Sequence, residues 1–423
     1  MRSIRCLTAP AQGGKIDAIA SKSELHRALI AASLSDQPTE LLFRGISEDI
    51  LATVRCLSAL GADIQPSEGG YRVFRGITPR FARTDAGESG STLRFLIPIA
   101  AALGVDVTFV GHGRLGSRPL SPLVDQLALH GVRIEGQGLP LRVCGRPSAG
   151  RYELAGNISS QFITGLLLAL PMLGKASEIA LTTPLESAPY VDLTLSVLRD
   201  FGILWQREGD EFKLAEGAVY RSPGKYVIEG DWSNAAFHLV LGALGEGVTV
   251  KGLDPSSLQA DRAILTALAL AGARIGIAGD EITVSPPDRL SAFDFDVSSC
   301  PDLFPVLSVL AAGADGESRL YGGARLRHKE SDRIASTLAM LTALGAKVEA
   351  TEDGMIVRGG RRLSGGEVDG AGDHRIVMAA AVARSLCDRD LAIVGAEAVA
   401  KSYPTFFEDY AILKGESHEV QLR

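Results

Sequence analysis

A repeat of about seventy residues constrains the fold of this chain more than any other feature of its sequence. Six related segments, among them "RCLSALGADI" and "AMLTALGAKV", contain a glycine that a strand-like pattern follows. These glycines recur every 70 to 73 residues, at Gly61, Gly131, Gly202, Gly272, Gly345 and Gly415. In the fifth segment, Ile334, Leu338 and Leu341 fall on one face of a helix. We therefore predict six amphipathic helices, each closed by a glycine in the left-handed conformation.

A second, more apolar helix is predicted upstream of each of these segments. These six helices begin with polar residues, in the segments "SKSELHRAL", "GESGSTLRFL", "NISSQFITGL", "GDWSNAAFHL", "SSCPDLFPVL" and "GDHRIVMAAA". Segments rich in β-branched residues, such as "VDVTFVG" and "LAIVGA", separate the helices and are typical of strands. The repeated unit is therefore strand–helix–strand–helix–strand. Because the second set of helices is apolar on most sides, we expect these helices inside and the sheets outside.

Six such units in 423 residues exceed a single core and predict two domains of three units each. We expect the first domain over residues 21–229. The second should comprise residues 230–423 together with 1–20, an extra leading pair of strands, with the hinge near 20 and 230. If rotation relates the units of a domain, their polar helix starts converge on one end, where several positive dipole ends can hold an anion.

Composition narrows the class of protein. The net charge is −7, which argues against a nucleic-acid partner. No signal peptide is visible and no apolar run approaches about 18 residues, so we expect a cytoplasmic protein without a membrane partner. The five cysteines are scattered, and none forms a metal-ligand pair, so disulfides and structural zinc are not expected. No heptad pattern demands a partner subunit, which favours a monomer.

Cations gather at the polar helix starts and in compact polar loops. They are Lys22, Arg27, Arg94, Arg118, Lys329, Arg333, His374, Arg375 and Lys401. On an acidic chain this clustering favours a small ligand with several negative groups, because arginine forks bind phosphate and carboxylate and lysine acts as a point charge. At a single start such as "SKSELHRAL", ordinary capping by serine is the alternative.

Two carboxylates stand beside these cations, Asp302 in "PDLF" and Glu330 in "HKESDR". They are either a proton-transfer pair or a helix-start aspartate and an ion-paired glutamate. The sequence contains no GxxxxGK[ST], HExxH or GxSxG motif. Asp373 and His374 are adjacent, which is poor spacing for joint metal ligation.

Three histidines outside the sixth helix start complete the inventory of candidate groups. His26, His112 and His130 are expected at the surface or as capping residues.

In this order, nine motifs closely resemble the 5-enolpyruvylshikimate-3-phosphate synthase family over the full length of the chain. They are "SKSELHRA", "GESGSTLRF", "GRLGSRPLSPL", "ISSQFITGLL", "SAPYVDLTL", "PDLFP", "RHKESDR", "GDHRIVMA" and "AKSYPTFFEDY". The resemblance implies an α/β (α+β) fold: a two-domain inside-out α/β barrel, with three βαβαββ repeats in each domain. Its helices are buried, its sheets lie outside, and the N-terminal strand is lent to the second domain.

The resemblance also implies an activity. The enolpyruvyl group of phosphoenolpyruvate is transferred to the 5-hydroxyl of shikimate 3-phosphate and phosphate is released, through a tetrahedral ketal, in aromatic amino acid biosynthesis. No metal or organic cofactor is implied. The first domain should serve mainly shikimate 3-phosphate, and the second much of phosphoenolpyruvate binding and acid–base chemistry. The domains should close on ligand binding, and glyphosate should inhibit.

Matching motifs carry residue roles over to this chain. The catalytic residues are then Lys22, Asp302, Glu330 and His374, with Glu330 protonating the vinyl carbon and Asp302 acting on the hydroxyl. Shikimate 3-phosphate is expected to contact Lys22, Ser23, Arg27, Ser159, Ser160, Gln161, Ser187, Tyr190, Asp302 and Lys329. Phosphoenolpyruvate is expected to contact Lys22, Gly90, Arg118, Gln161, Arg333, Arg375 and Lys401.

Four positions depart from the commonest family pattern, namely Glu88, Phe95, Arg325 and Gly372. Two other functions stay open. The sister family, UDP-N-acetylglucosamine enolpyruvyl transferase, usually carries a cysteine five residues before the loop arginine, where this chain has Gly113 before Arg118. A non-catalytic, anion-binding repeat protein is the third possibility, because periodicity alone would allow it.

Overall fold

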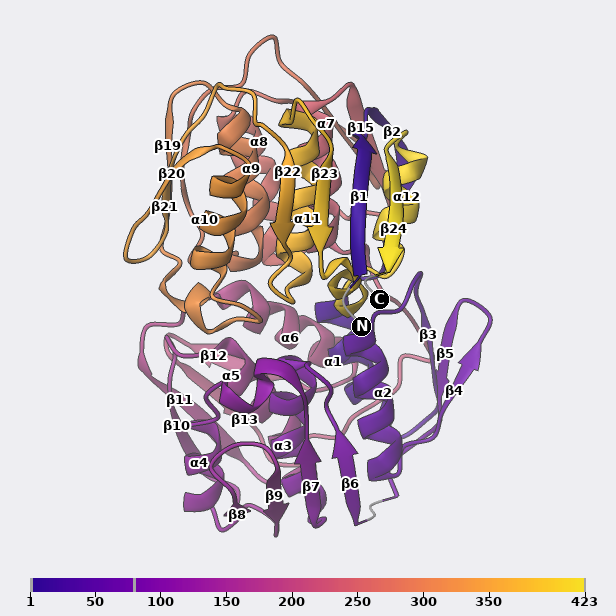
Figure 1. Cartoon of the computed structure of the whole chain (residues 1–423). Coiled ribbons are helices and arrows are strands. Elements are labelled where there is room, and N and C mark those ends of the chain that lie inside the picture. The colour runs from indigo at the N-terminus through magenta and orange to yellow at the C-terminus, as the bar shows by residue number, and fades with distance from the viewer. Residues whose placement is uncertain (1–2, 79–80, 422–423) are drawn as a thin grey trace. The chain divides into compact units, whose positions relative to one another are not determined.

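A computed structural model of the chain describes residues 3–78 and 81–421 and divides into two compact units (Figure 1). Unit 1 comprises residues 1–20, 45–47 and 229–423, and unit 2 comprises residues 21–44 and 48–228. Within the described residues there are six sheets of four strands each. Each sheet is built around one repeat, and three of the six sheets complete it with a strand from elsewhere in the chain.

One repeat of unit 2 shows the common pattern without interruption. Its elements are β6 (Ala82–Asp85), α3 (Gly90–Leu103), β7 (Val107–Val110), α4 (Leu123–Leu129), β8 (Arg133–Glu135) and β9 (Leu141–Cys144). β6 and β7 are parallel, whereas β9 pairs antiparallel with both β7 and β8, in the order β6-β7-β9-β8. This is the βαβαββ repeat that the family resemblance implies.

The other two repeats of unit 2 have the same plan. One contains α1 (Lys22–Leu34), β3 (Thr39–Leu42), α2 (Glu48–Leu60), β4 (Ile64–Ser67) and β5 (Gly70–Val73). The other contains β10 (Arg151–Ala155), α5 (Ser160–Ala169), β11 (Ser177–Thr183), α6 (Ala188–Asp200), β12 (Trp205–Glu208) and β13 (Glu211–Leu214). The chain then forms β14 (Lys225–Val227), which pairs parallel with β3 and supplies the first strand that the α1 repeat lacks.

Unit 1 also has three repeats. The first contains α7 (Trp232–Leu244), β15 (Gly247–Lys251), α8 (Ile264–Leu270), β16 (Arg274–Ala278) and β17 (Glu281–Ser285). The second contains β18 (Asp294–Asp296), α9 (Phe304–Gly313), β19 (Glu317–Tyr321), α10 (Arg333–Ala343), β20 (Lys347–Ala350) and β21 (Met355–Arg358). The third contains β22 (Gly366–Asp369), α11 (His374–Ala383), β23 (Leu391–Val394), α12 (Phe406–Ile412) and β24 (Glu416–Gln421).

The N-terminal segment completes two different repeats of unit 1. β1 (Ser3–Ala9) lies between β23 and β24 and pairs antiparallel with both, as Figure 1 shows. β2 (Gly13–Asp17) pairs parallel with β15. We expected residues 1–20 to form a leading pair of strands; the two strands instead join separate sheets, because each fills a position that its repeat leaves open.

The first helix of each repeat is buried, as its composition predicts. In α3, α7 and α11 almost every residue lies in the core. In unit 2, Gly165 of α5 allows a close approach to α3, since a Cβ atom there would lie 2.5 Å from the carbonyl oxygen of Arg94. The sheets cover these helices, and this arrangement confirms the predicted fold class.

The predicted glycine helix ends are confirmed in five of the six repeats and wrong in the last. Five glycines have positive φ angles, at Gly61, Gly131, Gly202, Gly272 and Gly345. After α12, however, Lys414 takes the left-handed conformation, with φ of 67°. Gly415 is needed there for another reason: a Cβ atom would lie 2.1 Å from the ring of Tyr410.

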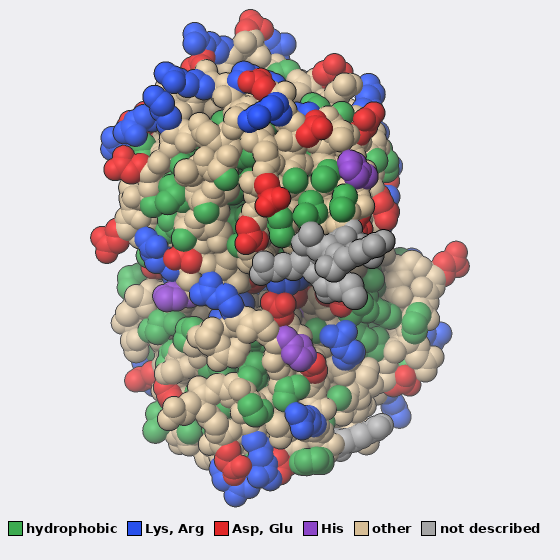
Figure 2. All heavy atoms as spheres, viewed as in Figure 1, with side chains coloured by type: hydrophobic (Ala, Val, Ile, Leu, Met, Phe, Trp, Pro, Cys, Tyr) green, Lys and Arg blue, Asp and Glu red, His purple; other side chains and the backbone are tan. Residues whose placement is uncertain are grey.

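The surface is mixed in charge. On the face shown in Figure 2, side chains of both signs are interspersed. Ion pairs also form across the sheets, such as that of Arg142 with Asp106 at 2.6 Å. None of the described helices is both long enough and apolar enough to cross a membrane.

Candidate functional site

The polar helix starts of unit 2 are capped by serine. Ser21, Ser89 and Ser159 precede α1, α3 and α5, and each hydroxyl accepts a hydrogen bond from a backbone amide of the first turn. These bonds are 3.2 to 3.3 Å long. Capping therefore does occur at "SKSELHRAL". It uses one of the first amides of each helix and leaves the positive end of the dipole in place for an anion.

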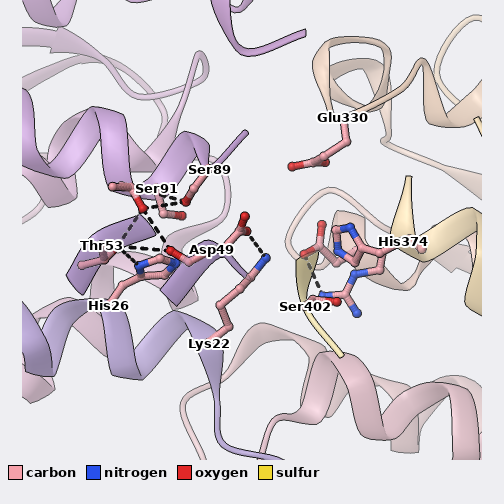
Figure 3. Close-up of polar contacts among 12 residues, drawn as sticks. Lys22, His26, Asp49, Thr53, Ser89, Ser91, Glu330, His374 and Ser402 are labelled. Atoms are coloured by element: carbon pink, nitrogen blue, oxygen red, sulfur yellow. Dashed lines mark hydrogen bonds and ion pairs between the residues drawn. The ribbon is translucent and has the colours of Figure 1, made fainter. Parts of the chain in front are cut away.

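Lys22 is the first residue of α1, and its ammonium group lies 2.8 Å from the carboxylate of Asp49 in the first turn of α2 (Figure 3). Both side chains are partly buried, with 17% and 14% of their surfaces exposed. Asp49 was not among the predicted site residues. The ion pair holds the ammonium group near the starts of α1 and α2. A ligand anion there would compete with Asp49 for the hydrogen bonds that the ammonium group donates.

Arg27 joins α1 to α6. Its Nε donates to the Thr194 hydroxyl at 2.8 Å, one terminal nitrogen donates to the Tyr190 carbonyl at 3.0 Å, and the other donates to the Ser23 carbonyl. Burial lowers the pKa of Arg27 to about 10, so the guanidinium stays charged at neutral pH. Ser187 caps the same α6 in a left-handed conformation, with φ of 54°. The predicted residues Ser23, Arg27, Ser187 and Tyr190 thus belong to the starts of two adjoining helices.

A second group in unit 2 links α3 to α5. Arg94 is buried and donates to the Gln161 side chain at 2.6 Å, and Gln161 in turn donates to the Ser91 hydroxyl at 2.9 Å. The Arg118 guanidinium covers the start of α3, because a Cβ atom on Gly90 would lie 2.7 Å from it. Gly90, Arg118 and Gln161 therefore lie together.

The same corner includes the start of α5. Ser159 is its cap and Ser160 its first residue, directly before Gln161. Two serine hydroxyls and the first amides of a buried helix thus stand beside the group formed with α3, in an arrangement suited to phosphate oxygens.

In unit 1, Arg333 is the centre of the predicted site. It is the first residue of α10 and only 1% of its side chain is exposed. It donates to Asp302 at 2.6 Å, to Glu330 at 2.8 Å and to Asp373 at 2.9 Å. These carboxylates raise its pKa well above the usual value, although burial alone would lower it. One buried guanidinium thus holds both predicted acid–base carboxylates.

Asp302 also contacts two further predicted cations. Lys329 lies 3.6 Å from one carboxylate oxygen and Arg375 lies 3.4 Å from the other. Arg375 is buried in α11 and donates to the Ser233 carbonyl at 2.8 Å, which ties it to the start of α7. Asp302 and Glu330 are therefore ion-paired, as one interpretation required. Both remain partly exposed, at 22% and 18%, as proton transfer to a ligand requires.

His374 and Lys401 flank this group. His374, the first residue of α11, is 2% exposed, and its Nδ1 lies 3.7 Å from Asp373. Figure 3 shows His374 and Glu330 among the drawn residues of unit 1. Lys401 ends the short helix Ala396–Lys401 and donates to the Gly372 carbonyl at 2.7 Å, next to the cap of α11.

Asp261 lies near Arg375 and is a further residue of this group that the sequence did not predict. It is buried and accepts a hydrogen bond from the Ser233 hydroxyl, the same residue whose carbonyl holds Arg375. Burial, and next the negative charge of Asp302, raise its pKa to about 6. Asp261 stands among other polar residues in "DPSSLQADR", and nothing in that local pattern distinguishes it from them.

The predicted location of His26 is wrong. His26 is fully buried in α1, and its Nδ1 lies 2.7 Å from the Thr53 hydroxyl of α2. Polar partners on α2 and α3 make this burial possible, and a local sequence pattern does not reveal them. His112 is exposed and pairs with Asp85 at 2.7 Å, and His130 stacks on Tyr152.

Two of the four unusual positions lie in contact with loops of the site. Glu88 packs against the loop that carries Arg118, since its carboxylate lies 2.3 Å from the position of a Cβ on Gly113. Arg325 donates to the Ser298 carbonyl at 3.0 Å, four residues before Asp302. Neither Glu88 nor Arg325 stands at the position of a site residue described above.

Comparison with known proteins gives one consistent family. The family model described as "EPSP synthase (3-phosphoshikimate 1-carboxyvinyltransferase)" matches residues 8–410. A 3-phosphoshikimate 1-carboxyvinyltransferase of Clostridium kluyveri is 42% identical, over 96% of each chain. One of Methanocorpusculum labreanum is 40% identical, over 96% of this chain and 97% of the relative. An EPSP synthase structure from Acinetobacter baumannii superposes with a TM-score of 0.82 at 27% identity, covering both chains fully.

Proposed function

This chain belongs to the EPSP synthase family, and we propose that it transfers the enolpyruvyl group of phosphoenolpyruvate to the 5-hydroxyl of shikimate 3-phosphate, releasing phosphate. The observation that carries this proposal is the arrangement around Arg333, where one buried guanidinium holds Asp302 and Glu330. A reaction that moves two protons needs two such groups beside cations that bind an anionic substrate.

In unit 2, Arg27 and Ser23 would hold the carboxylate of shikimate 3-phosphate. Its 3-phosphate would lie on hydroxyls and amides at the starts of α5 and α6, a usual place for phosphate. The residues proposed for these contacts are Ser159, Ser160, Gln161, Ser187 and Tyr190. Lys22 would contact both substrates.

Phosphoenolpyruvate would use a different set of cations. In unit 2, Gly90 leaves backbone space under the Arg118 guanidinium. In unit 1, Arg333, Arg375 and Lys401 would bind its phosphate and carboxylate, because planar guanidinium groups match both anions. Lys329 and Asp302 would contact the hydroxyls of shikimate 3-phosphate.

The proposed chemistry is addition followed by elimination. Glu330 gives a proton to the vinyl carbon while the 5-hydroxyl attacks the adjacent carbon and loses its proton to Asp302, with Lys22 assisting. A C–O bond forms, and the product is a tetrahedral ketal. In the second step the Glu330 carboxylate takes a proton back from the methyl group of the ketal, the double bond reforms, and the C–O bond to phosphate breaks so that phosphate leaves. Arginine and lysine side chains stabilise the charge that moves onto the leaving phosphate.

Addition and elimination both use the ion-paired cluster of Asp302, Glu330 and Arg333. Because Asp302 and Glu330 both contact Arg333, a proton gained by one changes the balance of charge felt by the other. His374, which is buried beside Asp373, would lie near Asp302 and Glu330 and near the leaving phosphate. We further propose a cytoplasmic monomer that needs no cofactor, membrane or nucleic acid.

Phosphate release from phosphoenolpyruvate tests the proposal directly. One reaction contains shikimate 3-phosphate and a second contains UDP-N-acetylglucosamine. We expect release only in the first. Release only in the second would assign the chain to the sister activity, and no release in either would support an anion-binding protein without turnover. Inhibition of the first reaction by glyphosate is the further expectation, and unchanged activity at saturating glyphosate would contradict it.

A further inference from the structure

A buried chain of hydrogen bonds joins the first three helices of unit 2. His26 of α1 lies 2.7 Å from the Thr53 hydroxyl of α2, and Thr53 lies 2.6 Å from the Thr92 hydroxyl of α3. Thr92 lies 2.8 Å from the Ser89 hydroxyl that caps α3. All four side chains are buried (Figure 3 labels His26, Thr53 and Ser89). None of them contacts a substrate in the proposed function.

The chain ends on the elements that carry two proposed substrate contacts. The Thr92 hydroxyl also lies 3.3 Å from the carbonyl of Asp49, whose side chain holds Lys22 at 2.8 Å. Ser89 directly precedes Gly90, the first residue of α3. The position of Lys22 relative to Gly90 therefore depends on how α1, α2 and α3 are held together.

Two proton arrangements run along the whole chain, although the Thr53 and Thr92 hydroxyls also have the carbonyl of Asp49 as a longer alternative acceptor, at 3.5 and 3.3 Å. Each hydroxyl supplies one proton and a neutral imidazole supplies one. If Nδ1 of His26 carries the proton, donation runs from His26 through Thr53 and Thr92 to Ser89. If Nε2 carries it, donation runs the other way, and Nε2–H remains buried without an acceptor among the described residues.

The first arrangement is the more stable one. A buried N–H without an acceptor is rarer and costlier than an acceptor without a donor. In the first arrangement the unused proton is that of Ser89, which can rotate about its Cβ–Oγ bond, whereas an imidazole N–H is fixed in direction. Burial, together with the charges of Lys22 and Arg27, lowers the pKa of His26 well below its usual value, so the ring is neutral.

We propose that His26 is a positioning residue that, as the Nδ1–H tautomer, directs the hydroxyls of Thr53, Thr92 and Ser89 and so fixes the start of α3 against the first turn of α2. The consequence for phosphoenolpyruvate, which would lie against Gly90 and Lys22, rests on the proposed function.

Nitrogen-15 NMR of the histidine-labelled protein tests the tautomer without reference to any activity. The His26 signals are assigned by their loss in His26→Asn. We expect proton-coupled Nδ1 and unprotonated Nε2 at neutral pH. Protonation on Nε2 alone, or a ring that takes up a proton near its ordinary pKa, would overturn the proposal even if the enzyme turns over as expected.

Kinetics of three variants test the positioning role. His26→Leu and Thr53→Val each break the chain, and we expect the KM for phosphoenolpyruvate to rise about fivefold or more, the equivalent of one hydrogen bond. His26→Asn keeps an N–H donor near the Nδ1 position and should stay within about twofold of the wild type. Rescue by asparagine separates a hydrogen-bonding role from simple filling of the core.

A matched control is His238→Leu in unit 1. His238 is also fully buried in the first helix of a repeat, but it packs against the rings of Tyr403 and Phe406 and is not part of this chain. Its replacement should leave the KM unchanged. If His26→Leu does not fold, Thr53→Val still decides. An unchanged KM in Thr53→Val would contradict the proposal, whereas an inactive wild-type enzyme would contradict the proposed function alone.

Discussion

Arg333 donates from its Nε to the carboxylate of Asp373 at 2.9 Å, and 1% and 0% of the two side chains are exposed. Asp373 also caps α11 by accepting from the backbone amide of Arg375. One carboxylate therefore joins the starts of α10 and α11. A buried ion pair of this kind is costly to break, because the remaining charge stays buried and loses part of its compensation.

Asp373→Asn should destabilise unit 1 strongly. We expect a loss of about 3 to 5 kcal/mol in the free energy of unfolding, measured by urea denaturation, because the Arg333 charge would lose its most buried partner. Asp388→Asn is the matched control, since Asp388 pairs with Arg362 at 2.9 Å on the surface. Equal losses in the two variants would show that the Arg333–Asp373 pair has no special weight.

Glu330→Gln should separate chemistry from binding. We expect kcat to fall by about 10²- to 10⁴-fold, the usual contribution of a general acid, with small changes in the KM of either substrate. Glu317→Gln, which removes a carboxylate that pairs with Arg358 on the surface, should leave kcat unchanged. A Glu330→Gln enzyme with near wild-type kcat would assign the carbon proton to another group.

Asp261 should make folding stability depend on pH in an unusual direction. Its pKa is about 6 in the folded protein and 3.8 in the reference state, so the folded state binds the extra proton between these values. Stability should therefore fall as pH rises from 4 to 6, by on the order of 3 kcal/mol from this group. Asp261→Asn should lack this slope and gain stability relative to the wild type at pH 7. The measurement is the free energy of unfolding of both proteins as a function of pH. Parallel curves for the wild type and Asp261→Asn would contradict the prediction.

Gly90→Ala should weaken phosphoenolpyruvate binding without unfolding the protein. The added methyl group meets the far end of the Arg118 side chain, which can move, rather than fixed backbone. We expect the KM for phosphoenolpyruvate to rise about tenfold or more while the melting temperature stays close to the wild type. The control is Gly276→Ala, where a Cβ has no neighbour closer than 3.8 Å. If the KM for phosphoenolpyruvate is unchanged in Gly90→Ala, Arg118 is not part of the phosphoenolpyruvate site.

Regular features of the fold could be predicted from the sequence because they depend on local patterns that repeat. Apolar helices at a constant period indicated buried helices, and glycine spacing indicated helix ends. The one wrong helix end shows the limit. At Gly415 the glycine is required by the ring of Tyr410, a contact within the folded helix end, and Lys414 adopts the strained conformation instead.

Partners in the candidate site could not be predicted from spacing, because they come from other helices of the folded unit. Asp49 pairs with Lys22 from the next helix, and Asp373 pairs with Arg333 from forty residues away. His26 was expected at the surface for the same reason, since nothing near it in sequence reveals Thr53 as its partner. The cations, by contrast, could be found because they recur at helix starts.

The position of β1 also sets an order for folding during synthesis. Of the described strands, β1 leaves the ribosome first, yet its neighbours β23 and β24 are made last. All of unit 2 emerges before α7, so unit 2 can fold while unit 1 still lacks most of its chain. Through that interval β1 and β2 have no sheet to join and expose strand edges, which are templates for wrong pairing. The first strand to be made is thus one of the last to be buried.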